Sequence, residues 1–421
     1  MIGLEAACSR YVGIVAHADA LLAAPDDSRL THVVALGPAP ADDLDGGGAG
    51  YAADPAAARA AALGEAIERY AAAEPPAGLP LARACELDGA VDPERFALFA
   101  PDQYRRASFP FVPFTRRTRV RWTEGRSLAD GARVFLPAQL VYLRWDALAD
   151  GEEPIGYSTS SGLACGGSFE EAALAGLLEL VERDAFMLAW RARLSLPLLE
   201  ISSVPELVAW ERRYLAASRL RLDVVDLSVV HDVPTALAVV RDAAGSLAAG
   251  AAAAPDPAGA YRKAVAEAYA SHGAARRMRS AAPRFRDDFS DVVSFGDHIR
   301  VYAEPANAAR ADFLTASPAR RPIRDVKPLE GQDTTEQLEA LVARLVACGI
   351  EPYAVDATTP DVAELGLHVV RAVAPELCPL DVRQDACFLG GERLRTAPAA
   401  LGLRARPLRI SELNLDPHPF P

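Results

Sequence analysis

Two segments of the chain repeat one pattern of charged and apolar residues. Residues 63–71 read LGEAIERYA and residues 177–185 read LLELVERDA, so each copy holds Glu-x-x-Glu-Arg with apolar residues at matching places. Two glutamates three positions apart are neighbours on one face of a helix. The repeat therefore predicts two helices, each with a pair of carboxylates on one face.

A third predicted helix carries charges of both signs. Residues 261–269 read YRKAVAEAY, and Lys263 lies four positions before Glu267, on the same face. If the three helices converge, their carboxylates cannot all stay ionised without cations. Magnesium ions that bridge nucleotide phosphates would supply the positive charge, and basic side chains would face the phosphate oxygens. The candidate carboxylates are Glu65, Glu68, Glu179, Glu182 and Glu267, and the candidate basic residues are Arg69, Arg183 and Lys263.

Two alternatives stay open for these glutamates. A Glu-x-x-Glu-Arg string is common on solvated helix faces, where charged pairs one turn apart support the helix. Glu171 lies eleven residues before Glu182, about 20° away around the helix axis, so it also joins the candidate set. However, Ser168 and Glu171 also fit a capping box at the start of that helix. The Gly/Ser-rich stretch 157–168 offers backbone N–H groups to an anion, but it lacks the P-loop order of residues, and a plain strand-to-helix turn is the better interpretation.

Charge and cysteine content exclude several classes of function. The formal net charge of −13 disfavours nucleic acid as a partner. No stretch of uncharged residues is long enough to span a bilayer, which predicts no membrane partner and a cytoplasmic protein. The six cysteines form no CxxC pair, so free thiols are expected rather than a zinc site. Cys165, in a Gly-rich turn, is interpreted as a small residue in a tight loop and not as a nucleophile.

Hydrophobic periodicity predicts a mixed α/β (α+β) fold. Helical patterns cover about 56–73, 169–191, 259–278 and 334–348, and alternating patterns predict strands at 119–122, 222–227, 236–241 and 369–373. Three stretches rich in breakers or small residues are expected to form loops or turns, namely 38–57, 243–260 and 316–333.

Taken together, these segments resemble the YcaO family over nearly the whole chain. Its first nucleotide and magnesium motif, Ser-x3-Glu-x2-Glu-Arg, is similar to Ala61…Glu65…Glu68-Arg69. Its second region is similar to SSGLACGGSFEEAALAGLLELVERDA at 160–185, and its Arg-x3-Glu motif to Lys263…Glu267. DATTPDVAELGLHVVRAVAPEL near 356–377 and LGGERL also match. The resemblance implies one YcaO domain over 1–421, with helices that carry glutamate clusters packed on several-stranded sheets.

The ending NLDPHPFP, residues 414–421, resembles that of the azoline-forming members of the family. Alternating prolines favour an extended segment that loses little entropy on ordering. The resemblance implies that this tail reaches the active site. Pro417, Pro419 and Pro421 are therefore the candidate catalytic residues, and the free carboxylate of Pro421 would assist proton transfer.

The resemblance implies an ATP- and Mg²⁺-dependent cyclodehydratase of a ribosomal precursor peptide. A Cys, Ser or Thr side chain attacks the preceding amide carbonyl, ATP phosphorylates the resulting oxygen, and loss of phosphate leaves an azoline. The implied magnesium ligands are Glu65, Glu68, Glu179, Glu182 and Glu267. The implied nucleotide contacts are Glu65, Glu68, Arg69, Glu171, Glu179, Arg183, Lys263 and Glu267. No segment is large enough to be the E1-like, leader-peptide-binding module, so a separate partner protein is expected. Because dimers are common among soluble enzymes, a homodimer is also considered.

The chain departs from the family motifs at four positions. Ala61 replaces serine, Ala164 and Ala175 stand where serine and glutamine would align, and Lys263 replaces arginine. The carboxylates remain while neutral nucleotide contacts are lost, so the sequence supports magnesium binding better than tight ATP binding. Two other functions stay open: thioamide or amidine formation, against which the Pro-rich end argues, and a non-catalytic scaffold that holds a peptide or a partner.

Overall fold

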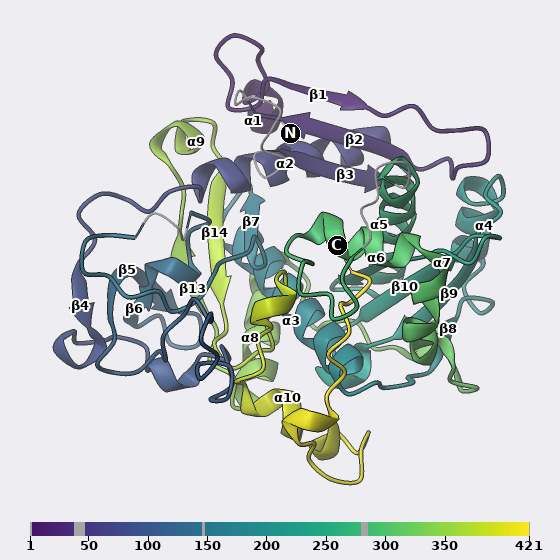
Figure 1. Ribbon diagram of the computed structural model, residues 1–421. Helices are drawn as coiled ribbons and strands as arrows, with labels where there is room; N and C mark the ends of the chain where they lie inside the picture. Colours follow the sequence, from purple (N-terminus) through teal and green to yellow (C-terminus); the bar gives the residue numbers. More distant parts are fainter. Residues whose placement is uncertain (1, 38–46, 145–147, 279–284, 421) are drawn as a thin grey trace.

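The computed structural model describes residues 2–37, 47–144, 148–278 and 285–420. Three sheets and the helices between them form a mixed α/β (α+β) architecture, which confirms the expected fold class (Figure 1). Among the described residues, no helix is long and apolar enough to cross a membrane.

The first sheet is a three-stranded antiparallel meander near the N-terminus. Its strands are β1 (His17–Ala20), β2 (Thr31–Leu36) and β3 (Gly48–Ala52). Helix α2 (Pro55–Ala71) packs against β2 and β3, with Asp54 as its N-cap. A Cβ atom at Gly48 would lie 2.2 Å from the Ala62 carbonyl oxygen, so the missing side chain lets this strand touch the helix backbone. The close approach fixes α2 on the sheet.

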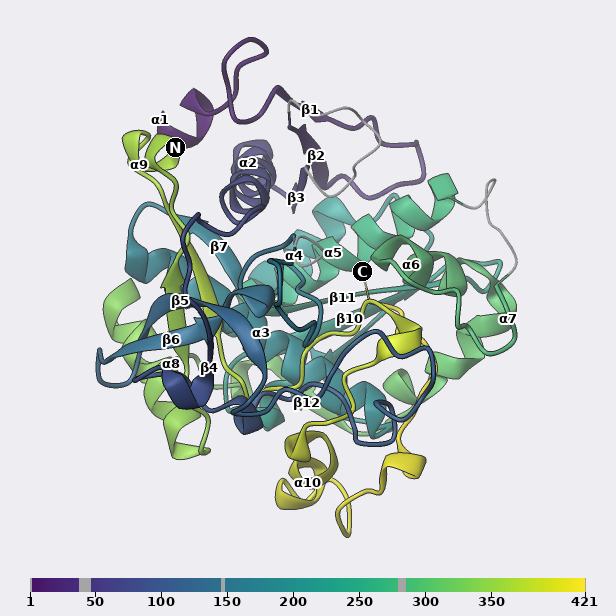
Figure 2. The same cartoon turned by 60° about the vertical axis from the view of Figure 1, so that its left-hand side comes forward.

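The second and third sheets lie on either side of helix α3 (Phe169–Arg191) (Figures 1 and 2). The six-stranded sheet has the order β4-β5-β13-β14-β7, with β6 paired to β5, and the five-stranded sheet has the order β11-β10-β9-β8-β12. The strands of the six-stranded sheet are β4 (Leu81–Arg83), β5 (Arg119–Ser127), β6 (Arg133–Pro137), β7 (Leu163–Gly166), β13 (Tyr353–Asp356) and β14 (His368–Val373). Those of the five-stranded sheet are β8 (Leu198–Glu200), β9 (Arg221–Asp226), β10 (Thr235–Arg241), β11 (Leu247–Ala253) and β12 (Arg320–Pro322).

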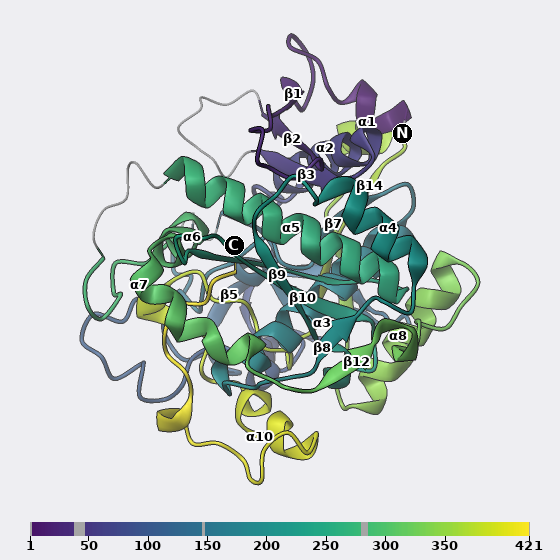
Figure 3. The same cartoon turned by 90° about the vertical axis from the view of Figure 1, so that its right-hand side faces the viewer.

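Strands β10 and β11 are covered by helices on both faces. Leu237 and Val239 of β10 belong to the same core cluster as residues 185–190 of α3. The alternate residues Ala236 and Ala238 pack with helix α5 (Pro257–Met278), which crosses the outer face of this sheet (Figure 3). The remaining helices are α1 (Ile2–Ala6), α4 (Pro205–Tyr214), α6 (Phe295–Ala303), α7 (Pro305–Ala308), α8 (Thr334–Ala347), α9 (Pro360–Glu364) and α10 (Glu392–Ala400).

All four predicted helices and all four predicted strands are confirmed. Their ends agree with the predictions to within two residues, except that the strand predicted at 119–122 extends to residue 127. All three predicted loops are partly wrong. Residues 247–253 form the fully buried β11, residues 48–52 form β3, and residues 320–322 form the short β12. Alanine and glycine fill β11 because α5 lies so close: a Cβ atom at Gly250 would lie 2.3 Å from the Ala268 nitrogen. Small residues here reflect close packing and not a turn. Residues 38–46 of the loop predicted at 38–57 lie outside the described residues.

Candidate functional site

The two glutamates of α2 join this helix to two different sheets. Glu65 accepts a hydrogen bond from the Ala49 backbone N–H of β3 at 2.6 Å and pairs with Arg69 at 2.6 Å. Glu68 accepts from the backbone N–H of Cys165 in β7 at 2.8 Å. Both carboxylates therefore use one oxygen to hold a strand backbone.

On α3, two glutamates share one arginine. Glu179 accepts from the Gly162 N–H at 3.0 Å and from Arg183 at 2.9 Å. Glu182 is 2% exposed, accepts from the Ala253 N–H of β11 at 3.2 Å, and forms an ion pair with Arg183 at 3.2 Å. Arg183 thus lies between the two carboxylates of the second repeat.

Helix α5 adds Lys263 and Glu267 to the same group of charges. Although burial opposes it, the carboxylates of Glu267 and Glu182 raise the pKa of Lys263. Arg183 in turn interacts with Glu182, Glu179 and Glu267. Figure 1 shows that α2, α3 and α5 all lie beside the central part of the molecule.

Like charges crowd this group, hereafter the carboxylate network (Glu65, Glu68, Glu179, Glu182 and Glu267). Burial and the charges of Glu65 and Glu179 raise the pKa of Glu68 to about 8. Burial and the charge of Glu182 raise the pKa of Glu267 to about 8, and burial raises that of Glu182 itself. Ionisation of all members therefore requires cations beyond Arg69, Arg183 and Lys263.

The network fits magnesium shared with phosphates better than a metal held by protein alone. Within the described residues, no group of three or more His, Cys, Asp or Glu side chains could hold a metal ion. The buried oxygen Oε1 of Glu182 has no hydrogen-bond partner there. Mg²⁺ is commonly bound through one or two carboxylates together with substrate phosphates and water. Carboxylates on three separate helices suit that kind of coordination.

Glu171 stands apart from this network. Its side chain accepts from the Gly167 N–H at 2.9 Å, and its own N–H donates to Ser168 at 3.1 Å. The serine half of the predicted capping box is therefore present, while the carboxylate binds one residue earlier than the motif requires. A nucleotide contact for Glu171 stays a prediction. Cys165 lies in strand β7 and not in the expected tight loop, and burial raises the pKa of its thiol to about 12, which disfavours the thiolate that a nucleophile needs.

The C-terminal tail lies against α3. The Phe420 ring packs over the Arg183 guanidinium at 4.3 Å and lies 4.9 Å from the Phe186 ring. Pro417 and Pro419 are buried, and Pro421 lies outside the described residues. Five consecutive backbone carbonyls, 414 to 418, each accept a hydrogen bond from a side chain elsewhere in the chain. The donors, in order, are Arg191, Gln384, Trp190, Tyr302 and His298.

Sequence reasoning missed Arg371, on strand β14 beside the network. It is 6% exposed, and burial lowers the pKa of its guanidinium to about 10, against the charge of Glu179. It donates to the backbone oxygens of Thr159 at 2.6 Å and Leu140 at 3.1 Å. An arginine inside the apolar run at 369–373 was the available signal.

Asp184, next to Arg183, belongs to a separate buried ionic group. It is 0% exposed, lies 2.7 Å from His231 Nε2 and forms hydrogen bonds to Arg393 at 2.8–3.1 Å. The Cys378 N–H donates to it at 2.9 Å. This group joins α3 to α10 and does not face the network.

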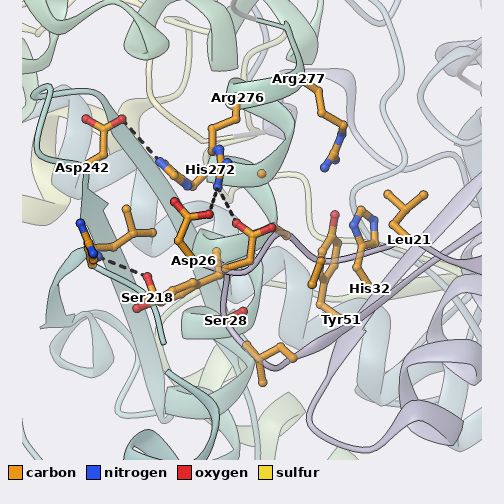
Figure 4. Close-up of a pocket in the computed structure, with 18 of the residues that line it drawn as sticks. Leu21, Asp26, Ser28, His32, Tyr51, Ser218, Asp242, His272, Arg276 and Arg277 are labelled. Atoms are coloured by element: carbon orange, nitrogen blue, oxygen red, sulfur yellow. Dashed lines mark hydrogen bonds and ion pairs between the residues drawn. The ribbon is translucent and has the colours of Figure 1, made fainter. Parts of the chain in front are cut away.

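A cavity of about 340 Å³ lies where β2 and β3 approach α5 (Figure 4). His32 and Tyr51 stack in its wall at 3.8 Å, and Arg277 extends toward them. Arg276 is paired with Asp27 at 2.6 Å. The lining therefore carries charges of both signs.

Comparison with known proteins gives consistent results. A family model described as YcaO cyclodehydratase, ATP- and Mg²⁺-binding, matches residues 49–378. An uncharacterized protein in the tfuA 3′ region of Rhizobium leguminosarum bv. trifolii is 30% identical over 374 residues, 83% of this chain and 81% of the relative. A heterocyclase solved in complex with substrate and cofactor has a similar fold, with a TM-score of 0.81 and 24% identity over 99% of this chain, which spans 56% of the heterocyclase. YcaO from Methanopyrus kandleri, bound with AMPPCP and Mg²⁺, gives a TM-score of 0.62 and 22% identity, covering 86% of each chain.

Proposed function

Because the chain belongs to the YcaO family, with ATP and Mg²⁺ as its cofactors, we propose that it closes azoline rings in a ribosomal precursor peptide. The reaction joins a Cys, Ser or Thr side chain to the carbonyl carbon of the preceding residue. The carbonyl oxygen leaves as phosphate, ATP is converted to ADP, and the amide nitrogen becomes the ring nitrogen.

The carboxylate network carries this proposal. Burial raises the pKa of Glu68 and of Glu267 to about 8, so the network lacks positive charge. The network carboxylates would hold magnesium together with the nucleotide phosphates, and the metal would supply positive charge that draws electron density from the transferred phosphoryl group. Three of the four departures from the family motifs are at neutral positions, the fourth replaces arginine by Lys263 and keeps the charge, and every carboxylate of the network is present.

The basic side chains position and neutralise phosphate oxygens. Arg183 would serve this task from a fixed position, because Glu179 and Glu182 pair with its guanidinium and the Phe420 ring packs over it. Lys263 adds a second positive charge from α5. The tail would enclose the reacting groups, and a carboxylate at Pro421 would accept the proton released by the attacking side chain.

A separate partner protein is part of the proposal. The chain spans 56% of the length of one heterocyclase and 50% of that of the heterocyclase TruD. We propose that the unmatched portion of those proteins has a counterpart in another polypeptide, which recruits the precursor peptide.

Mass spectrometry of a precursor peptide tests this function. The peptide is incubated with this protein, its partner, ATP and Mg²⁺, and the expected product has lost one water per ring in an ATP-dependent manner. Glu179→Gln should abolish the loss, whereas Glu339→Gln, at an exposed position of α8, should not. An unchanged peptide, with the partner present and bound, contradicts the proposal.

A non-catalytic scaffold is the second candidate. Ala61 and Ala175 are exposed positions, each one turn before a network glutamate, where the family motifs hold polar side chains. Absence of ATP turnover, together with peptide binding that Glu179→Gln leaves unchanged, would favour the scaffold.

A further inference from the structure

A largely apolar cavity of about 100 Å³ adjoins Arg183 of α3, and none of the network glutamates lines it. Its walls come from α3, β14 and the segments around residues 97, 140, 158 and 377. The apolar lining includes Leu98, Leu140, Tyr157, Leu180, Ala374 and Phe388. Two arginines, Arg183 and Arg371, are its basic residues.

Both arginines present unused hydrogen-bond donors. Within the part of the chain that the structure describes, Arg183 Nε and Nη1 and Arg371 Nε are buried without a hydrogen-bond partner. The Nη1 atom of Arg183 has only the ion pair with Glu182 at 3.2 Å. A buried donor without an acceptor destabilises a protein. Two donors without any acceptor, Arg183 Nε and Arg371 Nε, on residues that line one largely apolar cavity therefore indicate a ligand that brings an oxygen acceptor together with an apolar group.

We propose that this cavity binds the side chain of the substrate residue whose carbonyl is activated, which is the residue before the Cys, Ser or Thr that closes the ring. The assignment rests on the proposed function. The carbonyl group and the side chain belong to the same substrate residue. If Arg183 holds the carbonyl oxygen, the side chain of that residue therefore lies close to the cavity. Arg183 also contacts Glu179 and Glu182, so a substrate carbonyl oxygen bound to Arg183 would lie close to the carboxylate network.

The size of the cavity selects the side chain. An engineered cavity of about 150 Å³ admits benzene. The cavity of about 100 Å³ is smaller and suits an aliphatic side chain such as valine. The expected preference at this position is therefore aliphatic over glycine and aromatic residues.

Three variants and one peptide series test the proposal. Ala374→Leu narrows the cavity and Leu140→Ala widens it, while Ala363→Leu places the same new side chain at an exposed position of α9. Each protein is given peptides with Gly, Val or Phe before the modified residue. The readout is the ratio of kcat/KM between peptides within one protein, because a loss of folded enzyme cancels in that ratio.

The wild type should favour Val over Gly by about 10-fold or more, the range measured for one or two methylene groups in an apolar pocket. Ala374→Leu should lower this Val/Gly ratio about 10-fold. Leu140→Ala should raise the Phe/Val ratio by a similar factor, and Ala363→Leu should change neither. If Ala374→Leu does not fold, Leu98→Ala provides a second widening variant with the same expected gain for Phe.

The outcomes separate this inference from the proposed function. If the wild type is active and the cavity variants have the same Val/Gly and Phe/Val ratios of kcat/KM as the wild type, the cavity assignment is wrong and the proposed function still holds. A wild type that dehydrates no peptide, with the partner present and bound, overturns both.

Discussion

Replacement of Glu68 by glutamine should make the chain more stable at alkaline pH while it removes the response to nucleotide. Burial raises the pKa of this carboxyl from 4.5 to about 8. Between these values the folded chain keeps a proton that the unfolded chain has lost, so stability falls as pH rises. From pH 6 to pH 8 the loss is ~2 kcal/mol, at about 1.4 kcal/mol per pH unit. Glutamine keeps the acceptor for the Cys165 N–H and carries no proton to lose.

Thermal unfolding at the two pH values measures this effect. A 421-residue chain has an unfolding entropy of about 0.9 kcal/mol/K, so ~2 kcal/mol corresponds to about 2–3 °C. The Tm of Glu68→Gln minus that of the wild type should therefore increase by about 2–3 °C from pH 6 to pH 8 without magnesium. Glu339→Gln, at an exposed position, should show no such increase.

Magnesium and a non-hydrolysable ATP analogue provide the second half of the experiment. At about 100 times its Kd, a ligand stabilises a protein by about 2.7 kcal/mol, here about 3 °C. The wild type should show this gain at pH 8 and Glu68→Gln should lose most of it. A difference in Tm that is the same at pH 6 and pH 8 would refute the argument that Glu68 is protonated in the free protein.

Three further changes have defined outcomes. Asp184→Asn leaves the buried Arg393 without its carboxylate, so urea unfolding should show a loss of about 3–5 kcal/mol, and an unchanged midpoint would contradict the structural role of this group. Arg183→Lys keeps one charge but loses the planar contact with Phe420, so kcat should fall about 10-fold or more while Tm changes little; full activity would exclude Arg183 from the reaction. A chain that ends at residue 418 should lose dehydration activity yet keep its far-ultraviolet circular dichroism, because its carbonyl contacts remain; full activity would remove the tail from the site.

Local patterns predicted the helices that carry the network, because helical spacing alone decides which side chains share a face. The sequence could not show that Glu68 holds the backbone of Cys165, or that Glu182 holds that of Ala253, since any residue type supplies an N–H group. Those contacts determine how α2 and α3 lie relative to the sheets. They follow from tertiary packing and leave no trace in composition.

Two misses have physical causes of the same kind. Strand β11 was expected to be a loop because alanine and glycine have low strand propensity, whereas here two helices leave no room for larger side chains. Arg371 was not recognised because an isolated arginine in a strand is normally exposed. Its burial depends on the carbonyls of Thr159 and Leu140, more than two hundred positions earlier in the chain.

The way the tail is held has a consequence for engineering. Side chains of the protein body recognise five successive carbonyl oxygens of residues 414–418, a feature that nearly any peptide of the same conformation would offer. The protein body therefore holds this segment like a bound peptide ligand, in which the buried Asn414, His418 and Phe420 must be kept while the exposed Leu415 is free to vary. A shortened chain could accept a synthetic octapeptide added in solution, and chemical groups outside the genetic code could be brought to Arg183 by this route.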